Sequence, residues 1–354
     1  MKIIFFIRDL KIEGVQVVTL RLAKLLLDRG VEVEILTLHP DIHLDVPKNI
    51  VVKSLSFSSE NKEKDRFSLF YAWYESNKFD YLIASHGECI KVISKVDDNR
   101  LIPYFHNSDE YSYNRRGMFR RYKYRRRLRK QLNNKRALCV SEGIKSFMIK
   151  CMKEEKIDIS VLYNPIDIDN IRRKSKEYTF TFDGGGFLLY TGRLEPQKRV
   201  DRLIDSFNLI KNNKINLLIL GEGSLERELK YQVKKLGIEA RVKFKKFVKN
   251  PYPIMAAAKG LLLTSDHEGL PTVLIESLSL GVPVISVDCP TGPSEILTGD
   301  LECFLVSSKN EKEIASRIDW LLAADSLPSL AEGYEKFTED KIYQKFRDIF
   351  LTQN

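Results

Sequence analysis

The sequence predicts an α/β protein with two doubly wound, Rossmann-like domains. Short apolar runs alternate with longer amphipathic stretches, which is typical of strands and helices in turn and therefore of a parallel sheet. This pattern restarts after the glycine triplet at residues 184–186, and 354 residues with 43% hydrophobic content are enough for two cores. Ligands of such sheets bind at the carboxyl ends of the strands, so we expect two domains that face each other across a cleft.

The predicted strands of the first half are its short apolar runs. They lie at residues 3–7, 31–38, 81–85, 101–105 and 137–141, with an amphipathic helix over Val17–Asp28. The first run ends at Arg8 and Asp9, so it is too short for a signal-peptide core or a membrane span, and we interpret it as a buried strand. No later segment reaches the roughly 18 uninterrupted apolar residues of a spanning helix.

The second half repeats this order of strands and helices. Its predicted strands lie at residues 187–192, 216–220, 242–244, 260–265 and 283–288, and its first two helices at Val200–Lys211 and Ser224–Leu236. Near residues 164–182 a proline, a charged RRKSKE run and three glycines interrupt the periodicity. We therefore expect domains over residues 1–167 and 168–337, with a C-terminal helix at about 338–354 that packs back on the first domain.

The composition indicates the kind of partner and compartment. The 58 Lys and Arg against 48 Asp and Glu give a net charge of +10, which favours anionic partners such as nucleotides, nucleic acid or an acidic membrane surface. The five cysteines are scattered without a Cys-x-x-Cys pair, which argues against a disulfide framework or a structural zinc site. We expect reduced thiols and a cytoplasmic protein whose membrane contact is peripheral.

The most informative segment follows the apolar run GLLLTS and reads DHEGLPTVLIE, from Asp266 to Glu276. Pro271 suits the first turn of a helix, so the free backbone amides near residues 269–272 can face an anion. Glu268 then lies in the loop before the helix, and Glu276 lies more than one turn inside it, roughly 7 Å further along the axis. Two carboxylates at different depths suit hydroxyl groups on two parts of an extended ligand.

A second cluster of polar residues, TGRLEPQKR from Thr191 to Arg199, follows the apolar run FLLY and precedes another predicted helix. Arg193 and Lys198 are therefore expected at the end of a strand. Cations at this place suit the charge of a diphosphate.

Together these residues resemble the retaining glycosyltransferases of family 4, whose donor domain carries a Glu, seven residues and a second Glu. Glu268 and Glu276 have this spacing. The resemblance extends over most of the chain, through an N-terminal strand and glycine loop, GRLEPQKRVDRLIDSF, LLILGEGSLERELK and GVPVISVDCPTGPSEIL. It implies the GT-B fold, with an acceptor-binding N-terminal domain and a C-terminal domain that binds the nucleotide-sugar.

The resemblance also implies roles for single residues. Glu276 is expected to accept hydrogen bonds from the ribose hydroxyls, and Glu268 to hold hydroxyls of the donor sugar. Arg193 and Lys198 are expected to bind the diphosphate and to stabilise the negative charge on the leaving group. The remaining implied donor-binding residues are Gly269, Leu270, Pro271, Thr272 and Gly14. Retention follows from attack on the face from which the leaving group departs, and we see no dedicated nucleophile.

The loop after the first strand departs from the two-glycine pattern of the family. Gly14 matches one glycine, but Glu13 replaces the other. A carboxylate beside two phosphates would repel them, so either Glu13 points away or the loop serves the acceptor more than the donor. His106 follows the run LIPYF, where the resembling enzymes place an active-site histidine, and it is counted with the catalytic residues; His86 has a weaker claim.

A strongly basic segment runs from Arg115 to Arg136, with twelve Lys or Arg interleaved with aromatic and aliphatic residues. On a helical projection, Arg115, Arg116, Arg120, Lys123, Arg126, Arg127 and Lys130 share an arc of roughly 140°, with most apolar residues opposite. This pattern predicts a basic amphipathic helix. Arg116, Arg120, Lys123 and Arg127 are expected to contact an anionic membrane surface or a lipid-linked phosphate, at about 1 kcal/mol per basic group.

Three alternatives remain open at this point. Asp167 and Asp169 have the Asp-x-Asp spacing of metal-dependent sugar transferases, but Arg193 and Lys198 already supply cationic charge, so we interpret the pair as a surface turn and expect no metal. A sugar-nucleotide epimerase would share the two-domain architecture. A nucleic-acid-binding protein would use the basic segment for phosphates and its tyrosines for stacking.

The expected function is transfer of a hexose or N-acetylhexosamine from a nucleotide-sugar to a glycan acceptor of the bacterial surface, such as lipopolysaccharide, capsule or a lipid-linked oligosaccharide. The segment DCPTGPSE at residues 288–295 resembles bacterial members that use UDP-sugars. No cofactor and no nucleic-acid partner are expected. The enzyme is expected on the inner face of the cell membrane.

Overall fold

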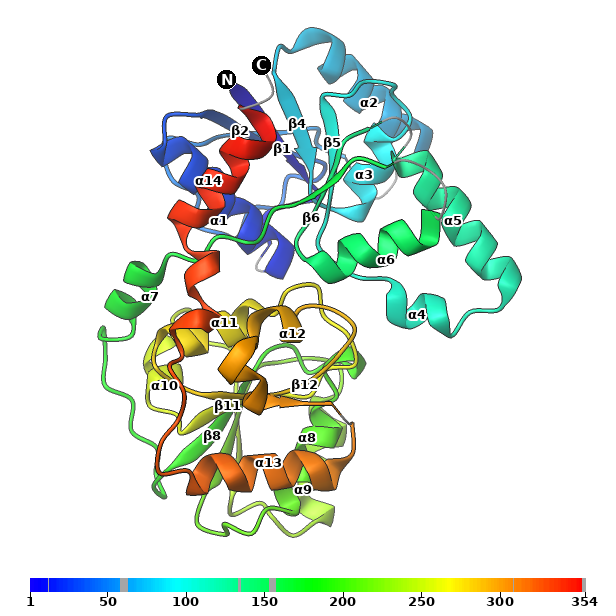
Figure 1. Cartoon of the computed structure of the whole chain (residues 1–354). Helices are drawn as coiled ribbons and strands as arrows, with labels where there is room; N and C mark the ends of the chain where they lie inside the picture. Colours follow the sequence, from blue (N-terminus) through cyan, green and yellow to red (C-terminus); the bar gives the residue numbers. More distant parts are fainter. Residues whose placement is uncertain (12, 58–62, 133–134, 153–156, 308, 352–354) are drawn as a thin grey trace. The chain divides into compact units, whose positions relative to one another are not determined.

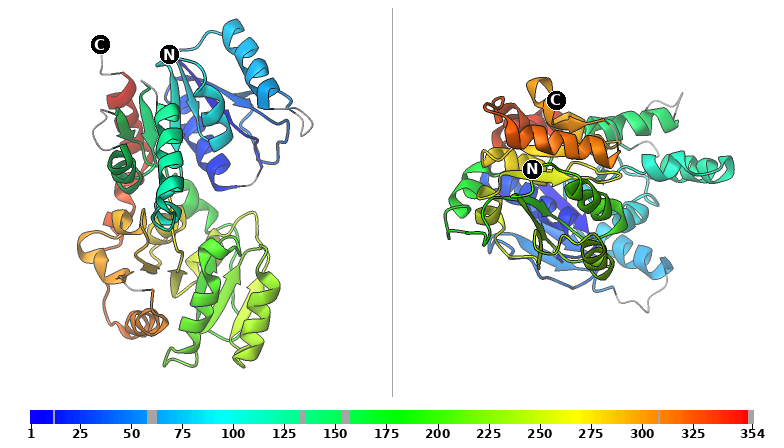
Figure 2. Two further views of the ribbon diagram at one scale, coloured as in Figure 1. Left: turned by 90° about the vertical axis from the view of Figure 1, so that its right-hand side faces the viewer. Right: turned by 90° about the horizontal axis from the view of Figure 1, so that it is seen from below.

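The computed structural model describes residues 1–11, 13–57, 63–132, 135–152, 157–307 and 309–351 (Figure 1). The chain divides into two compact units, of which unit 1 comprises Met1–Pro165 with the residues from Glu339 onward, and unit 2 comprises Ile166–Thr338. The expected division after residue 167 lies two residues beyond the observed one. Each unit is a parallel sheet with helices, so the predicted α/β class with two doubly wound sheets is confirmed (Figure 2).

The sheet of unit 1 has seven parallel strands in the order β3-β2-β1-β4-β5-β6-β7. The strands are β1 (Lys2–Ile7), β2 (Glu32–Thr37), β3 (Val51–Ser54), β4 (Tyr81–Ala84), β5 (Leu101–Phe105), β6 (Ala137–Cys139) and β7 (Ile159–Val161). The chain moves outward from β1 in one direction and later from β4 in the other. The order of strands therefore reverses between β1 and β4, which is where such sheets form a ligand-binding crevice.

The helices of unit 1 bury apolar side chains against these strands. They are α1 (Gly14–Asp28), α2 (Glu63–Ser76), α3 (Gly87–Ile93), α4 (Glu110–Asn114), α5 (Met118–Leu132), α6 (Glu142–Met152) and α14 (Glu339–Phe350). On one face of the sheet, Phe6 from β1 stacks on Phe70 from α2 with ring centroids 5.2 Å apart. Residues 3 to 7 of β1 are at most 1% exposed, as expected for a central strand covered on both faces.

Helix α14 belongs to unit 1 although it follows unit 2 in the chain, and Figure 1 shows it beside α1. Arg29, after α1, forms an ion pair with Asp340 of α14. At the other end of α14, Phe350 packs edge-on against Tyr81, with ring centroids 4.9 Å apart. The C-terminal helix thus packs back on the first unit.

The sheet of unit 2 has six parallel strands in the order β10-β9-β8-β11-β12-β13. They are β8 (Phe187–Thr191), β9 (Asn216–Leu220), β10 (Val242–Lys245), β11 (Gly260–Leu263), β12 (Val284–Val287) and β13 (Leu305–Val306). The main helices are α7 (Ile168–Lys174), α8 (Val200–Asn208), α9 (Glu226–Lys235), α10 (Tyr252–Ala256), α11 (Thr272–Ser279), α12 (Pro293–Ile296) and α13 (Glu311–Ala323). The order of strands reverses between β8 and β11, whose carboxyl ends precede the two predicted donor-site loops.

Candidate active site

Two loops meet at the crevice of unit 2, one after β8 and one after β11. Backbone and side-chain hydrogen bonds join them, since Asp266 N donates to Gln197 O at 2.9 Å and Gln197 Nε2 donates to His267 O at 2.7 Å. Thr264, at the end of β11, donates its hydroxyl to the carbonyl of Arg199 at 2.9 Å. The two predicted sequence clusters are therefore neighbours in space.

The structure brings Lys198 and Glu268 into direct contact. Lys198 Nζ donates to Glu268 Oε1 at 2.7 Å, and the Glu268 side chain is only 8% exposed. A cation and a carboxylate thus lie side by side at the carboxyl edge of the sheet. Such a pair can present positive charge to a phosphate and acceptor oxygens to hydroxyl groups.

Helix α11 places Glu276 one turn beyond the loop. The helix begins at Thr272, and Pro271 precedes it with a ψ of 87°, so the proline is the N-cap residue rather than part of the first turn as predicted. Glu276 is buried on this helix. Gly269 lies in the loop beside Glu268, and Leu270 is buried there.

The loop that carries Arg193 is clamped by the chain after β9. A Cβ on Gly221 would lie 1.9 Å from the carbonyl oxygen of Gly192, and a Cβ on Gly223 would lie 2.4 Å from that of Leu194, so both positions require glycine. The backbone is also bonded across this contact, from Gly192 N to Leu220 O at 3.1 Å and from Leu194 N to Glu222 O at 2.9 Å.

The clamp fixes the backbone of Arg193 and leaves its side chain exposed. Tyr190, buried under the loop, donates its hydroxyl to the Arg193 carbonyl at 2.7 Å. The guanidinium forms no hydrogen bond or ion pair with any residue in the part of the chain that the structure describes. Arg193 is thus a cation on a rigid loop, and the structure does not pair it with Glu268 as it does Lys198.

A third loop, after β12, packs against the Glu268 loop and supports it. Gly292 has a φ of 96°, and a Cβ there would lie 2.5 Å from Pro271 Cδ and 3.0 Å from Gly269 O. Thr291 donates its hydroxyl to the carbonyl of Glu268. From the sequence, this segment showed only a resemblance to UDP-sugar enzymes, and its supporting role was not predicted.

An ionic cluster around the buried Asp266, beside the site, was not predicted from the sequence. Asp266 Oδ1 lies 2.9 Å from Arg202 Nη2, 3.3 Å from Lys309 Nζ and 3.5 Å from Arg199 Nη1. Arg199 is in the left-handed region with a φ of 50°, which is costly for an arginine and is held here by the bond from Thr264. Two sequence features could have predicted this cluster: the Arg or Lys residues at positions 198, 199 and 202, and the acidic DHE segment at residues 266–268.

Gly14 and His106, the predicted site residues of unit 1, lie at the carboxyl edge of its sheet. Gly14 begins α1, and a Cβ on it would meet nothing within 4 Å, so no close packing requires a glycine there. Glu13 directs its carboxylate to Arg8, with Arg8 Nη2 3.0 Å from Glu13 Oε1. The structure therefore gives this carboxylate a cationic partner.

His106 follows β5, and its ring centroid lies 4.2 Å from that of Tyr104. Its Nε2 is buried and has no hydrogen-bond partner among the described residues. Burial, with a smaller contribution from His86, lowers the pKa of His106 to about 3, so the ring is neutral near pH 7. A neutral imidazole can donate or accept a hydrogen bond but supplies no positive charge.

The basic segment differs in two ways from the predicted helix. Arg115 and Arg116 lie in the turn between α4 and α5, so they are not part of the helical arc. Only Tyr124, Leu128 and Leu132 form the buried stripe of α5. Phe119, which is 68% exposed, lies within the basic arc, and Met118 and Tyr122 are also exposed, so the expectation that most apolar residues lie opposite the arc is wrong.

The four predicted acceptor or membrane residues differ in exposure and pairing. Arg120 and Lys123 are exposed, and Lys123 Nζ lies 4.5 Å above the ring of Phe119. Arg127 pairs with Asp109 at 3.0 Å, and Arg116 is partly exposed. The exposed face of α5 thus combines cations with apolar side chains.

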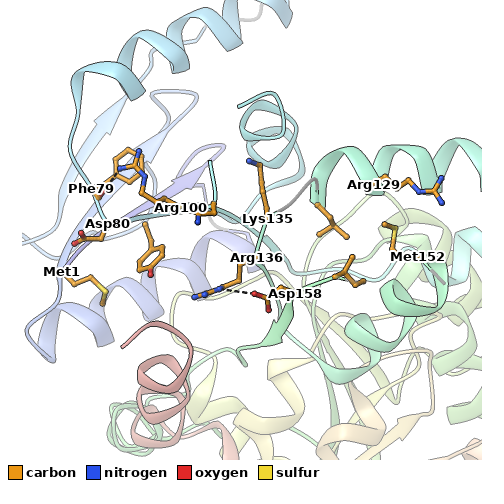
Figure 3. Close-up of a pocket in the computed structure, with 13 residues that line it drawn as sticks. Met1, Phe79, Asp80, Arg100, Arg129, Lys135, Arg136, Met152 and Asp158 are labelled. Carbon is orange, nitrogen blue, oxygen red and sulfur yellow. Dashed lines mark hydrogen bonds and ion pairs between the residues drawn. The ribbon is translucent and has the colours of Figure 1, made fainter. Parts of the chain in front are cut away.

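A hollow of about 1270 Å³ lies at the opposite, amino edge of the unit 1 sheet (Figure 3). Three of its cations already have partners in the protein: Arg100 pairs with Asp98 at 2.7 Å, Lys135 donates to Val96 O at 2.5 Å, and Arg136 lies 3.4 Å from Asp158. This hollow is therefore a poorer candidate for an anionic ligand than the carboxyl edge.

Two further expectations concern metals and membranes. Asp167 caps α7 by accepting a hydrogen bond from Asn170 N at 3.0 Å, and Asp169 lies in the first turn of this helix, so the pair begins a helix and is not the expected surface turn. The described residues contain no group of three His, Cys, Asp or Glu that could hold a metal ion.

None of the described helices combines the length and the apolarity that crossing a membrane requires. All five cysteines are thiols rather than disulfides, and four are buried.

Both halves of the chain match models of glycosyltransferase families. Residues 12–170 match the family described as Glycosyltransferase Family 4, and residues 171–339 match Glycosyl transferases group 1. The chain is therefore a glycosyltransferase whose first half is of the Family 4 type and whose second half is of the group 1 type. The two matches divide the chain at the same place as the two structural units, within five residues.

Two curated bacterial relatives illustrate the similarity. The N-acetylgalactosamine-N,N'-diacetylbacillosaminyl-diphospho-undecaprenol 4-alpha-N-acetylgalactosaminyltransferase of Campylobacter jejuni is 34% identical over 187 residues, which is 53% of this chain and 50% of the relative. The lipopolysaccharide 1,6-galactosyltransferase of Escherichia coli is 28% identical over 226 residues, which is 61% of each chain. The chain thus spans about half to three fifths of the length of these relatives.

Solved glycosyltransferase-family structures share the whole fold. Anabaena Alr3699/HepE in complex with UDP and glucose has a TM-score of 0.79 at 18% identity, with 99% of each chain covered. The lipopolysaccharide outer core galactosyltransferase WaaB has a TM-score of 0.76 at 22% identity, with 100% of each chain covered. The fold is therefore the GT-B fold that the sequence predicts.

Proposed function

We propose that this protein is a retaining glycosyltransferase that moves a hexose or N-acetylhexosamine from a UDP-sugar to a glycan acceptor of the bacterial surface. The contact between Lys198 and Glu268 carries the proposal, because it joins the two predicted donor loops at the crevice of unit 2. The relatives named above transfer sugars to lipopolysaccharide or to a lipid-linked diphosphate, and HepE was solved with UDP.

In this proposal the chemistry is stabilisation of the leaving diphosphate. The departing group gains negative charge as the bond to the anomeric carbon breaks, and preorganised cations and amides lower the energy of that state. Arg193, exposed on its clamped loop, and Lys198 supply the cations, and the backbone N–H groups of Gly269, Leu270 and Thr272 supply the amides. Glu268 accepts hydroxyls of the sugar, and Glu276 accepts the ribose hydroxyls.

The second part of the proposal is attachment to an anionic membrane surface through α5. The exposed face of this helix combines Arg120, Lys123, Arg126 and Lys130 with Met118, Phe119 and Tyr122. Cations are attracted to acidic headgroups, while the apolar side chains enter the boundary with the acyl chains. This arrangement favours a lipid-linked or membrane-embedded acceptor on the inner face of the cell membrane.

A thermal-shift panel of nucleotide-sugars tests the donor assignment. A ligand that binds only the folded protein raises the melting temperature according to its concentration and affinity, so a UDP-sugar is expected to raise it and GDP-sugars are not. Absence of a shift with every nucleotide-sugar would refute the donor site. A product assay without acceptor then separates transfer from epimerisation, because an epimerase converts the donor sugar by itself; the sugar-transferring relatives favour transfer.

A further inference from the structure

The crevice of unit 1 contains a polar cluster that the donor site does not use. It lies where the strand order reverses, between the carboxyl ends of β1 and β4. Arg8 and Asp9 follow β1, Glu13 and Gln16 lie at the start of α1, and His86 follows β4. Hydrogen bonds link the first four of these residues, and His86 Nε2 lies 3.4 Å from Arg8 Nη1.

Arg8 is the centre of this cluster. Its Nε donates to the buried Asp9 at 2.6 Å, and its Nη2 donates to Glu13 Oε1 at 3.0 Å. Gln16 Nε2 donates to the other oxygen of Asp9 at 2.8 Å. Burial opposes ionisation of Asp9, but the bonds from Gln16 and Arg8 outweigh it and lower the pKa of the carboxyl. Arg8 is therefore fixed in position, while Glu13, with a side chain 48% exposed, keeps one carboxylate oxygen for another donor.

His86 faces two hydrogen-bond donors at once. Its Nδ1 accepts from the backbone N–H of Glu88 at 3.3 Å and so caps α3. A neutral ring that accepts through Nδ1 carries its proton on Nε2. That Nε2 lies 3.4 Å from Nη1 of Arg8, which is also a donor. Burial, followed by the charge of Arg8, lowers the pKa of His86 and keeps the ring neutral.

The two nitrogens, both donors, therefore need an acceptor between them, and an oxygen atom of a ligand can serve as that acceptor. Placed about 2.9 Å from both nitrogens, it would accept from Arg8 Nη1 and from His86 Nε2. If that oxygen belongs to a hydroxyl group, its own proton can be donated to the open oxygen of Glu13. Two donors and one carboxylate acceptor fit a sugar hydroxyl, which both accepts and donates.

Buried polar atoms nearby also lack partners among the described residues. Gln16 is fully buried, and its Oε1 has none. Ser85, which precedes His86 and is 3% exposed, has an unpartnered hydroxyl. Buried polar groups are rarely left without a hydrogen bond, so such atoms at a sheet edge indicate a ligand or bound water.

We propose that Arg8, Glu13 and His86 form a subsite for a hydroxyl group of an uncharged acceptor sugar, and that Glu13 excludes anionic sugars from it. This inference rests on the proposed function, which requires an acceptor. The charges support the exclusion. Arg8 carries +1 and Asp9 with Glu13 carries −2, so the cluster has a net charge of −1, and the adjacent Arg66 and Glu88 neutralise each other at 2.7 Å. A carboxylate or phosphate on the sugar would approach Glu13 against this charge.

The test compares binding of methyl α-D-glucopyranoside and methyl α-D-galactopyranoside with that of their uronic acid counterparts, measured by saturation-transfer NMR on the full chain without donor. Wild type is expected to bind a neutral glycoside about tenfold more tightly than its uronide. Glu13→Gln is expected to reduce this preference to about threefold or less, because the amide keeps the shape and removes the charge. His86→Asn keeps a side chain that can cap α3 and removes the Nε2 donor, so it is expected to weaken neutral glycosides about tenfold.

Glu32→Gln is the matched control. Glu32 is a glutamate of the same unit, 62% exposed and paired with Lys2 at 2.8 Å, and it lies at the start of β2, at the amino edge. This variant is expected to retain the preference of wild type. Failure of both neutral glycosides to bind, or unchanged binding in Glu13→Gln and His86→Asn, would overturn the subsite. The UDP-sugar thermal shift of the same variants separates this result from failure of the proposed function, since the shift is expected to stay as in wild type.

Discussion

Lys198 Nζ lies 2.7 Å from Glu268 Oε1, so the cation assigned to the diphosphate and the carboxylate assigned to the donor sugar are already paired. The pair keeps two largely buried charges compensated while no ligand is bound, with side chains 18% and 8% exposed. Each partner therefore positions the other, and their contributions to transfer are not expected to add.

Replacement of either partner is expected to reveal this coupling. Lys198→Ala removes a cation from the leaving group and is expected to lower kcat about 100-fold to 1000-fold. Glu268→Gln is expected to lower kcat as well, and the double variant is expected to be only slightly worse than Lys198→Ala. Steady-state kinetics of the four proteins measures the coupling. Independent, multiplicative losses would contradict a shared role, and Lys235→Ala on the exposed face of α9 serves as the control.

Substitutions of Glu276 and Arg193 are expected to affect different steps, UDP binding and sugar transfer respectively. Glu276→Ala removes an acceptor for the ribose hydroxyls and is expected to weaken UDP binding about tenfold to 100-fold. Arg193→Ala is expected to slow transfer more than it weakens binding, because its cation acts mainly on the charge that develops in the transition state. Calorimetric titration with UDP and single-turnover kinetics separate the two effects. Equal and negligible effects of both substitutions would refute the roles given to them.

The glycine clamp predicts a large effect of one added methyl group. Gly221→Ala would place Cβ 1.9 Å from the Gly192 carbonyl, so the Arg193 loop must move. We expect a stability loss of more than about 2 kcal/mol and loss of transfer activity. Gly237→Ala is the control, because Gly237 also has a positive φ, of 69°, but a Cβ there meets nothing within 4 Å. That variant is expected to lose only about 1 kcal/mol. Urea unfolding of both variants measures the difference, and equal losses would show that the clamp is unimportant.

His106 predicts a dependence of stability on pH. Its folded-state pKa is about 3, whereas an unfolded histidine titrates near 6.5. Below pH 6.5 the unfolded chain binds a proton that the folded protein does not, so the contribution is complete above pH 6.5 and is lost as the pH falls toward 3. The expected slope is at most about 1.4 kcal/mol per pH unit. Urea unfolding between pH 5 and pH 7.5 should show a steeper decline for wild type than for His106→Asn. Parallel curves would mean that His106 binds its proton over the same pH range in the folded and the unfolded protein.

The exposed face of α5 predicts binding to acidic vesicles. Lys123→Gln is expected to weaken partitioning into vesicles rich in phosphatidylglycerol about fivefold, and Phe119→Ala is expected to weaken it further. The matched control is Tyr231→Ala with Lys235→Gln on α9, which has the same spacing of an exposed aromatic residue and a lysine. Vesicle sedimentation measures the partitioning. Equal losses from the two pairs would indicate a general charge effect rather than a membrane-binding face.

The sequence predicted the central strands and the donor loops because their signals are local. β1 and β9 are short apolar runs buried on both faces, and the DHEGLPTVLIE segment combines its motif with a strand before it and a helix after it. β3, β7 and β13 were missed. The last two have three and two residues, and β3 has four, of which three are exposed, so none of them has a recognisable hydrophobic pattern.

Contacts across the chain could not be predicted. The Gly221 clamp depends on the separation of two backbones, and the three cations around Asp266 come from positions up to 110 residues apart in sequence, Arg199 and Lys309. The pairing of Glu13 with Arg8 likewise needs the geometry of the turn between them. In α5, periodicity predicted an exposed basic face, but it did not show that Arg115 and Arg116 precede the helix or that Met118, Phe119 and Tyr122 are exposed with the cations.

Because α14 belongs to unit 1, unit 2 is inserted into the chain of unit 1, and the two ends of this insertion are adjacent. Ile166 pairs with Thr338, and Ile166 N donates to Phe337 O at 2.9 Å, so the chain enters and leaves this unit at one point. A segment with adjacent ends can be exchanged for another without rerouting the rest of the chain. On the proposed function, replacing residues 166–338 with the corresponding segment of a relative is expected to change the donor sugar and keep the acceptor. Exchange of this one segment would then combine a new donor sugar with the existing acceptor.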